Sequence, residues 1–231
     1  MLTHSTRQVG QVTVIRVAGR IVTGEASDSL RDHVQYVLHD RRWLVLNLGD
    51  VSFVDSTGLG TIVRLLSLTR QARGDLKLCN LPPGVQKLLT ITTTYKLFDT
   101  HETEEKAIEA FYTGSIPDPE HVRKGPPVIC IHRNPDVQAY LRELLRKAGY
   151  DVQTATTMRD ARVLVRVTRP ALVVVEQEAT TDPDRKAAFE SACAGLPCIV
   201  LDSDFSTQHA AEAATSLLER IAQVAPTAGP A

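Results

Sequence analysis

The chain has 231 residues, of which 43% are hydrophobic and 23% are charged, so it can bury a core and lacks the composition of a disordered protein. This length favours two domains of ~100 to 150 residues each. Its 26 Lys and Arg residues nearly balance its 27 Asp and Glu residues, with no run of like charge, which argues against direct binding of nucleic acid or an anionic membrane.

The cysteines and the apolar runs indicate the cellular compartment in which the protein is expected. No two of the four cysteines have the two-residue spacing of a zinc or redox motif, and no signal peptide opens the chain. We therefore expect reduced thiols in the cytoplasm, with no metal and no cofactor. No apolar run approaches the ~18 residues of a membrane span, so we expect no membrane-spanning segment.

Proline and glycine indicate where the domains divide. The stretch from Gly114 to Pro127 has no apolar periodicity and several helix-breaking residues. The expected organisation is a first domain at 1–112, a linker at 113–126, a second domain at 127–225 and a flexible tail at 226–231.

In the first domain, strands alternate with helices. Strands are expected at residues 12–17, ending in a turn at Gly19-Arg20, then at 43–48, 76–80 and, as a short extended piece, 96–98. Apolar residues at helical spacing predict helices around 30–38, capped by Ser27 or Asp28, after residue 58, at 85–89 and at 102–112. This alternation predicts a mainly parallel sheet covered by helices.

The second domain alternates more regularly. Strands are expected at 128–131, 152–155, 172–175 and 198–201, and helices at 137–145, 158–167, 185–194 and 210–224. The pattern is typical of a doubly wound α/β domain with four strands.

The sequence Asp55-Ser56-Thr57-Gly58 stands between an apolar strand and an amphipathic helix. A structural explanation is a helix cap, since Asp, Ser and Thr side chains accept hydrogen bonds from first-turn amides and Gly58 eases the bend. A functional explanation uses the same geometry, because a phosphate on a hydroxyl at a helix start meets free amides and the positive end of the helix dipole.

Three segments carry a resemblance to a known family: Gly19-Arg20-Ile21-Val22, residues 43–60 and residues 76–81. In this order they resemble the STAS domain of bacterial anti-sigma factor antagonists, over about residues 1–112. The resemblance implies a mixed β-sheet with helices. It also implies a regulatory binding protein without catalytic residues.

The resemblance further implies partner switching. The unphosphorylated antagonist would bind an anti-sigma factor, often a Ser/Thr kinase, which phosphorylates the serine matching Ser56 and so ends the interaction, and a phosphatase would restore it. Asp55, Thr57 and Gly58 would flank the phosphoacceptor in the partner-binding surface, with Thr57 as a substitute acceptor. Glu25 would be the acidic partner contact that the family often carries after an early strand.

Residues 128–135 and 169–176 resemble the first and third strands of a response-regulator receiver domain, over about 127–224. The receiver's acidic pair is replaced by His132 and Arg133, its phosphoacceptor by Glu176 and its hydroxyl residue by Asp202. Too few acidic groups converge to hold Mg²⁺, so phosphotransfer is not expected. These four residues would gather at the carboxyl ends of the strands, where doubly wound sheets bind ligands, or would form only surface or rim ion pairs, which is the preferred interpretation. The domain would supply a docking surface or a homodimer contact.

Two other classes of function stay open. In the first, the protein is a scaffold or an accessory subunit of a signalling or transport complex, and Ser56 only helps to cap a helix. In the second it is an enzyme, which is disfavoured because the chain has no Gly-rich phosphate loop, nucleophile elbow or metal-ligand spacing.

Overall fold

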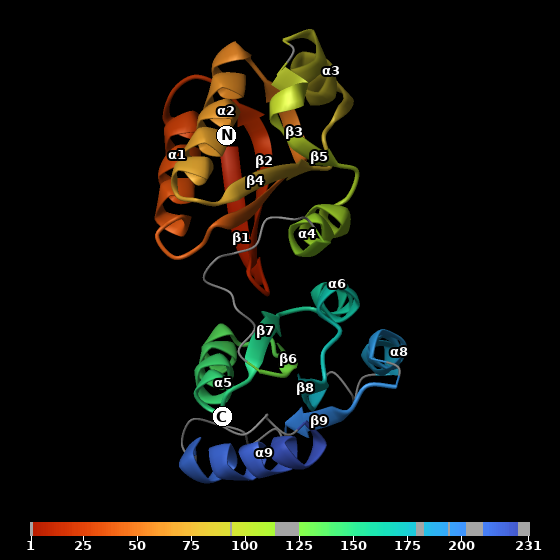
Figure 1. Cartoon of the computed structure of the whole chain (residues 1–231). Helices are drawn as coiled ribbons and strands as arrows, with labels where there is room; N and C mark the ends of the chain where they lie inside the picture. The colour runs from red at the N-terminus through yellow and green to blue at the C-terminus, as the bar shows by residue number, and fades with distance from the viewer. Residues whose placement is uncertain are drawn as a thin grey trace. The chain divides into compact units, whose positions relative to one another are not determined.

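The structure is a computed structural model that describes residues 2–92, 94–113, 125–178, 183–193, 195–201 and 210–225. The chain divides into two compact units, residues 1–111 and 112–231 (Figure 1). Most of the expected linker (114–124) and the whole expected tail (226–231) lie outside the described residues.

The first unit is built on a mixed sheet with the strand order β5-β4-β3-β2-β1. Its strands are β1 Leu2–Val9, β2 Val12–Ile21, β3 Trp43–Val54, β4 Asp75–Cys79 and β5 Asp99–His101. β1 and β2 form an antiparallel hairpin, and the other neighbours are parallel. Parallel neighbours need crossover connections, which the helices of this unit supply.

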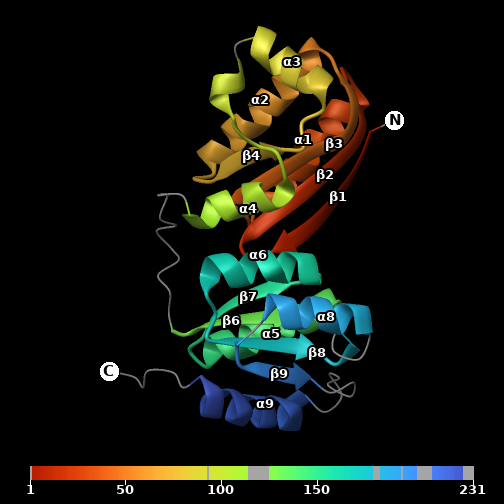
Figure 2. The same ribbon diagram turned by 90° about the vertical axis from the view of Figure 1, so that its right-hand side faces the viewer.

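Helices cover both faces of this sheet (Figure 2). They are α1 Glu25–Val37, α2 Ser56–Gln71, α3 Pro83–Ile91 and α4 Glu104–Thr113, with a 3-10 turn, η1, at Thr94–Leu97. The main core joins α1, α2 and α3 to strand residues such as Leu44 and Leu46. Their neighbours Trp43 and Asn47 point the other way and contact α4, where the Trp43 ring stacks on Phe111 at 5.6 Å.

A buried polar network holds α4 on the sheet. The Glu104 residue is only 3% exposed, and its carboxylate pairs with the guanidinium of Arg7 on β1. Its second oxygen accepts a hydrogen bond from Asn47 Nδ2 on β3 at 2.6 Å. The network therefore ties together three elements that are far apart in the sequence.

Several sequence-based boundaries in this unit were wrong. β1 was not expected at all, β2 continues through Gly19-Arg20 instead of turning there, and β3 continues to Val54. α1 begins after Gly24, whose φ of 105° favours glycine, while the hydroxyl of Ser27 donates to Val22 O from inside the helix. Residues 96–98 belong mostly to η1, and the short strand follows them as β5.

In the described residues of the second unit, four parallel strands lie in the order β7-β6-β8-β9. The strands are β6 Pro127–Ile131, β7 Asp151–Ala155, β8 Leu172–Glu176 and β9 Cys198–Leu201. The helices are α5 Pro135–Lys147, α6 Met158–Thr168, α8 Pro183–Ala192 and α9 Ala210–Val224. One core packs α5 and α9 against the strands, and α6 contacts α8. This strand order is that of a doubly wound sheet with its first strand inside.

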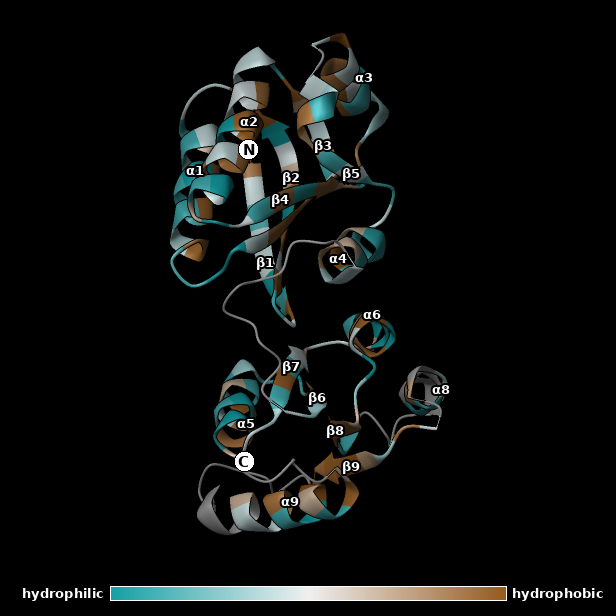
Figure 3. Cartoon of the chain, viewed as in Figure 1, coloured by the Kyte–Doolittle hydropathy of each residue, from teal (hydrophilic) through white to brown (hydrophobic). Residues whose placement is uncertain are grey.

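Hydropathy agrees with this layering. Figure 3 shows hydrophobic and hydrophilic residues on different sides of helices such as α5 and α6. Among the described helices, none is long and apolar enough to cross a membrane.

Candidate functional site

The turn between β3 and α2 is held by the carboxylate of Asp55. Its Oδ1 accepts a hydrogen bond from Gly58 N at 2.6 Å, which makes Asp55 the N-cap of α2. Its Oδ2 lies 3.5 Å from Thr23 N, in the loop that leads into α1. Asp55 N also donates to Ile21 O at 3.3 Å, at the end of β2. One side chain thus fixes the start of α2 and joins it to the β2–α1 loop.

Ser56 and Thr57 occupy the first turn of α2, and both are exposed. No hydrogen bond joins the Ser56 hydroxyl to any other residue that the structure describes. Because the first N–H groups of a helix have no acceptor within the helix, the surroundings of this hydroxyl carry positive partial charge. The cap function predicted for this tetrapeptide therefore belongs to Asp55, and the Ser56 hydroxyl is left accessible.

Gly58 is required for a reason other than the bend. A Cβ atom at this position would lie 2.0 Å from Ile21 O and 2.8 Å from Ile21 C. Both are backbone atoms of β2, so they cannot rotate away. Gly58 lets the start of α2 pass directly over the end of β2.

Glu25, the predicted acidic contact, is exposed at the first position of α1. The Thr23–Asp55 contact brings its loop beside the Ser56 turn, although no hydrogen bond or ion pair joins Glu25 to the turn residues. The two segments predicted to meet a partner therefore lie at the same end of the sheet.

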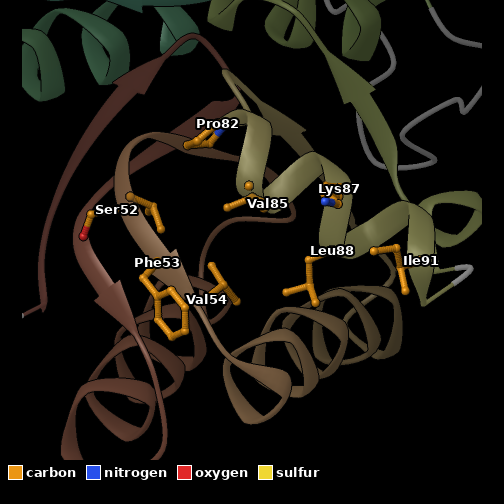
Figure 4. A pocket seen from close by; sticks show the side chains of 10 residues that line it. Ser52, Phe53, Val54, Pro82, Val85, Lys87, Leu88 and Ile91 are labelled. Atoms are coloured by element: carbon orange, nitrogen blue, oxygen red, sulfur yellow. The ribbon is translucent and has the colours of Figure 1, made fainter.

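A groove that was not expected from the sequence adjoins this turn. It measures about 300 Å³ and lies between the last residues of β3 and helix α3 (Figure 4). Its lining consists of Val51, Ser52, Phe53, Val54, Pro82, Gly84, Val85, Lys87, Leu88 and Ile91. The guanidinium of Arg20 on β2 lies over the Phe53 ring, 5.0 Å from its centroid. A signal in the sequence was the apolar pair Phe53-Val54 immediately before the turn.

In the second unit, three of the four predicted residues of the receiver-like site come together. Arg133 Nε donates to Glu176 Oε1 at 3.0 Å and Arg133 N donates to Glu176 Oε2 at 3.1 Å. Arg133 also pairs with Glu178 at 2.7 Å. The fourth residue, Asp202, lies outside the described residues.

His132 is also close to Glu176. Its Nδ1 accepts a hydrogen bond from Asn134 N at 3.0 Å and lies 3.8 Å from Glu176 Oε2. In the described part of the chain no group of three or more His, Cys, Asp and Glu residues could hold a metal ion. The Glu176 carboxylate is 14% exposed and already neutralised by Arg133. Arg133 thus pairs with two carboxylates, those of Glu176 and Glu178.

The first unit matches a known protein family. Residues 4–107 match the family model described as the STAS domain. The chain is 28% identical over 99 residues to an anti-sigma F factor antagonist from Paenibacillus polymyxa, an alignment that covers 42% of this chain and 84% of that protein. A STAS-domain containing protein from Pseudomonas aeruginosa is 30% identical over 89 residues, 38% of this chain and 87% of that protein.

Among solved structures, an anti-sigma factor antagonist from Mycobacterium paratuberculosis is similar, with 22% identity and a TM-score of 0.43, over 48% of this chain and 93% of that one. The match at residues 4–107 confirms the resemblance inferred from the three sequence segments of the first unit. This chain belongs to the STAS-domain family.

Proposed function

We propose that this protein is an anti-sigma factor antagonist whose binding to an anti-sigma factor is ended by phosphorylation of Ser56. The observation that carries the proposal is the exposed Ser56 hydroxyl at the start of α2. Asp55 caps this helix, so the Ser56 hydroxyl is not needed for the cap. The names of relatives from Paenibacillus polymyxa and other bacteria support the role. In this role the protein regulates sigma-dependent transcription as a binding partner and not as an enzyme.

The position of Ser56 explains how a phosphate would act. A phosphoserine adds a charge of about −1.5 to −2 near neutral pH. At this site the first-turn amides of α2 stabilise it, and the Asp55 carboxylate adds to the negative charge that a partner meets. The buried face of α2, which includes Leu59 and Ile62, is not involved. Phosphorylation would therefore change the surface charge while the fold stays the same.

The proposed partner is an anti-sigma factor that is itself a Ser/Thr kinase, and a phosphatase would reverse the modification in the cytoplasm. Asp55, Ser56, Thr57 and Gly58 form the centre of the partner surface, with Glu25 on the adjoining loop as a further contact. Thr57 is exposed one residue further along α2 and would be a substitute acceptor.

For the second unit we propose a degenerate receiver-like domain that docks or dimerises without phosphotransfer. The parallel strand order and the Arg133 clamp on Glu176 support this assignment. A phosphoaccepting receiver uses carboxylates to bind Mg²⁺. Because Arg133 already pairs with the Glu176 carboxylate, we do not expect that carboxylate to bind Mg²⁺. Analytical ultracentrifugation of the full chain tests the homodimer, which would appear as a species of twice the monomer mass.

The test of the switch starts with peptide mapping of the protein purified from its own host. The expected result is phosphate on Ser56 that phosphatase removes. A chain bare at Ser56 and Thr57 in every growth and stress condition would contradict the switch and favour the scaffold.

A second experiment measures binding of the kinase that copurifies with the dephosphorylated chain. Ser56→Asp is expected to weaken binding at least tenfold because it places a charge in the contact surface, whereas the Ser56→Ala control keeps a neutral surface and binds. Unchanged binding of Ser56→Asp would again favour a constitutive scaffold.

A further inference from the structure

The groove beside the Ser56 turn leaves apolar side chains in contact with solvent. The Phe53 residue on β3 is 47% exposed and the Ile91 residue at the end of α3 is 70% exposed. Val85 and Leu89 of the same helix are buried and already anchor α3 to the core. Ile91 and Phe53 are therefore not needed to hold α3 in place, and together with the half-buried Leu88 they form an apolar surface that a partner could cover.

One wall of this groove is an open strand edge. β3 pairs with β4 only from Trp43 to Asn47, because β4 ends at Cys79. β2 lies on the other side of β3 and pairs with it as far as Val54. Beyond Asn47, no strand in the described ranges pairs with the β4 side of β3. The groove lining includes four consecutive residues of this stretch, 51–54, as expected of a strand met along its edge (Figure 4).

The groove lining contains one charged residue, Lys87, and the guanidinium of Arg20 lies against the lining residue Phe53. Lys87 is exposed on the α3 side, and Arg20 lies over the Phe53 ring on the β3 side. Neither forms an ion pair with an acidic residue in the part of the chain that the structure describes. The nearby Asp50 does have a cationic neighbour, Arg16, at 3.9 Å. An occupant with carboxylates would therefore complement this groove, and one with lysines would be repelled.

We propose that the groove binds an extended, apolar and acidic segment of the partner protein, which adds as a strand to the free edge of β3. Main-chain hydrogen bonds to an open edge supply affinity in this mode of recognition, and alternate side chains supply specificity. Apolar side chains of the segment pack on Phe53 and Leu88, and its carboxylates face Lys87 and Arg20. The identity of the partner as an anti-sigma factor rests on the function proposed above.

Gly84 provides a way to block the groove without removing a core residue. It lines the groove in the first turn of α3, and a Cβ atom there would have no other atom within 4 Å. Gly84→Leu therefore fills the groove from one wall. Gly84→Ala is the matched control, because it makes the same backbone change and leaves most of the space open.

The probes are three ten-residue peptides, titrated against the full-length chain. The first alternates valine and glutamate, the second alternates valine and lysine, and the third is the first with two alternate valines replaced by proline. Proline removes backbone donors from the segment, so the third peptide tests strand pairing. Hydrogen exchange of the amides at 51–54 reports whether an added strand covers the edge.

The glutamate peptide is expected to bind and to slow exchange at 51–54, with the lysine and proline peptides at least tenfold weaker. Gly84→Leu should weaken the glutamate peptide at least tenfold, and Gly84→Ala should bind within about twofold of the parent chain. Absence of binding, binding that Gly84→Leu does not change, or binding without protection of the edge would each overturn the proposal. The proposal would also be overturned if ultracentrifugation showed a dimer and the amides at 51–54 exchanged slowly in that dimer without peptide, because a second copy of the chain would then cover the edge.

These results separate the groove from the switch. Peptide binding needs neither a kinase nor a phosphate, so a chain that binds the peptide but is bare at Ser56 keeps the groove assignment and loses the switch. A chain that is phosphorylated on Ser56, and whose Gly84→Leu variant still binds the copurified kinase normally, keeps the switch and loses the groove assignment.

Discussion

Gly58→Ala tests whether α2 is held as close to β2 as the structure places it. The new Cβ atom would lie 2.0 Å from Ile21 O, well inside contact distance, so the backbone of α2 or β2 would have to move. Overpacking of this kind costs about 3 kcal/mol. Alanine is favoured over glycine inside a helix by about 1 kcal/mol, which offsets part of the cost. The net loss of unfolding free energy should be about 2 kcal/mol.

Gly60→Ala is the matched control in the same helix. A Cβ atom at Gly60 meets nothing within 4 Å, so only the helix preference applies and this variant should gain about 1 kcal/mol. With a urea dependence of about 2 kcal/mol per molar, the midpoint should fall by about 1 M for Gly58→Ala and rise by about 0.5 M for Gly60→Ala.

Urea unfolding followed by tryptophan fluorescence measures both variants. Trp43 is the single tryptophan of the chain and lies on β3, so its signal reports the first unit within the full-length protein. If Gly58→Ala were as stable as Gly60→Ala, the close passage of α2 over Ile21 would be refuted, and with it the reason given for glycine at this position.

The other predictions use the same fluorescence assay. Asp55→Ala removes the cap of α2 and should cost about 1 kcal/mol, while Asp55→Asn keeps an acceptor and should cost less; equal losses would contradict the capping role. Arg7→Met leaves the buried Glu104 carboxylate without its cation and should cost about 3 kcal/mol, part of which a second change, Glu104→Gln, recovers; a stable single variant would contradict the network. Burial and, second, His4 lower the pKa of His33, so the unfolded chain takes up protons first as the pH falls below the ordinary value of about 6.5. The stability that neutral His33 contributes is therefore present above that pH and lost as the pH falls below it. The urea midpoint of His33→Gln should therefore change less between about pH 7 and pH 5 than that of the parent chain.

Sequence patterns located elements whose residues form the cores. Two short runs are buried on both faces, residues 44–48 of β3 and residues 172–175 of β8. In α2 the helical spacing of leucine and isoleucine coincides with the buried face. β1 was missed because its residues 2–9 are mostly polar and only partly buried, so its place depends on hairpin pairing with β2. Local spacing carries no signal for a strand that is fixed by its neighbour.

Site geometry was predictable where it is local and not where it depends on packing. The cap at Asp55 follows from four consecutive residues. The requirement for Gly58 depends on Ile21, which is 37 positions earlier, and the clamp of Arg133 on Glu176 joins residues 43 positions apart. The groove depends on where β4 ends relative to β3, which no single segment encodes.

The end of β3 connects the two proposals made for the first unit. Residues 51–54 form a wall of the groove, and Asp55 and Ser56 follow them directly. A segment paired with this edge would continue toward the Ser56 turn, where the phosphate would meet its carboxylates. The repulsion would act over a few residues of one strand, and the Asp55 cap and the close contact at Gly58 would keep that strand and α2 in place. A rigid turn is therefore an advantage for such a switch, because movement of the domain would not relieve the repulsion between the phosphate and the partner segment.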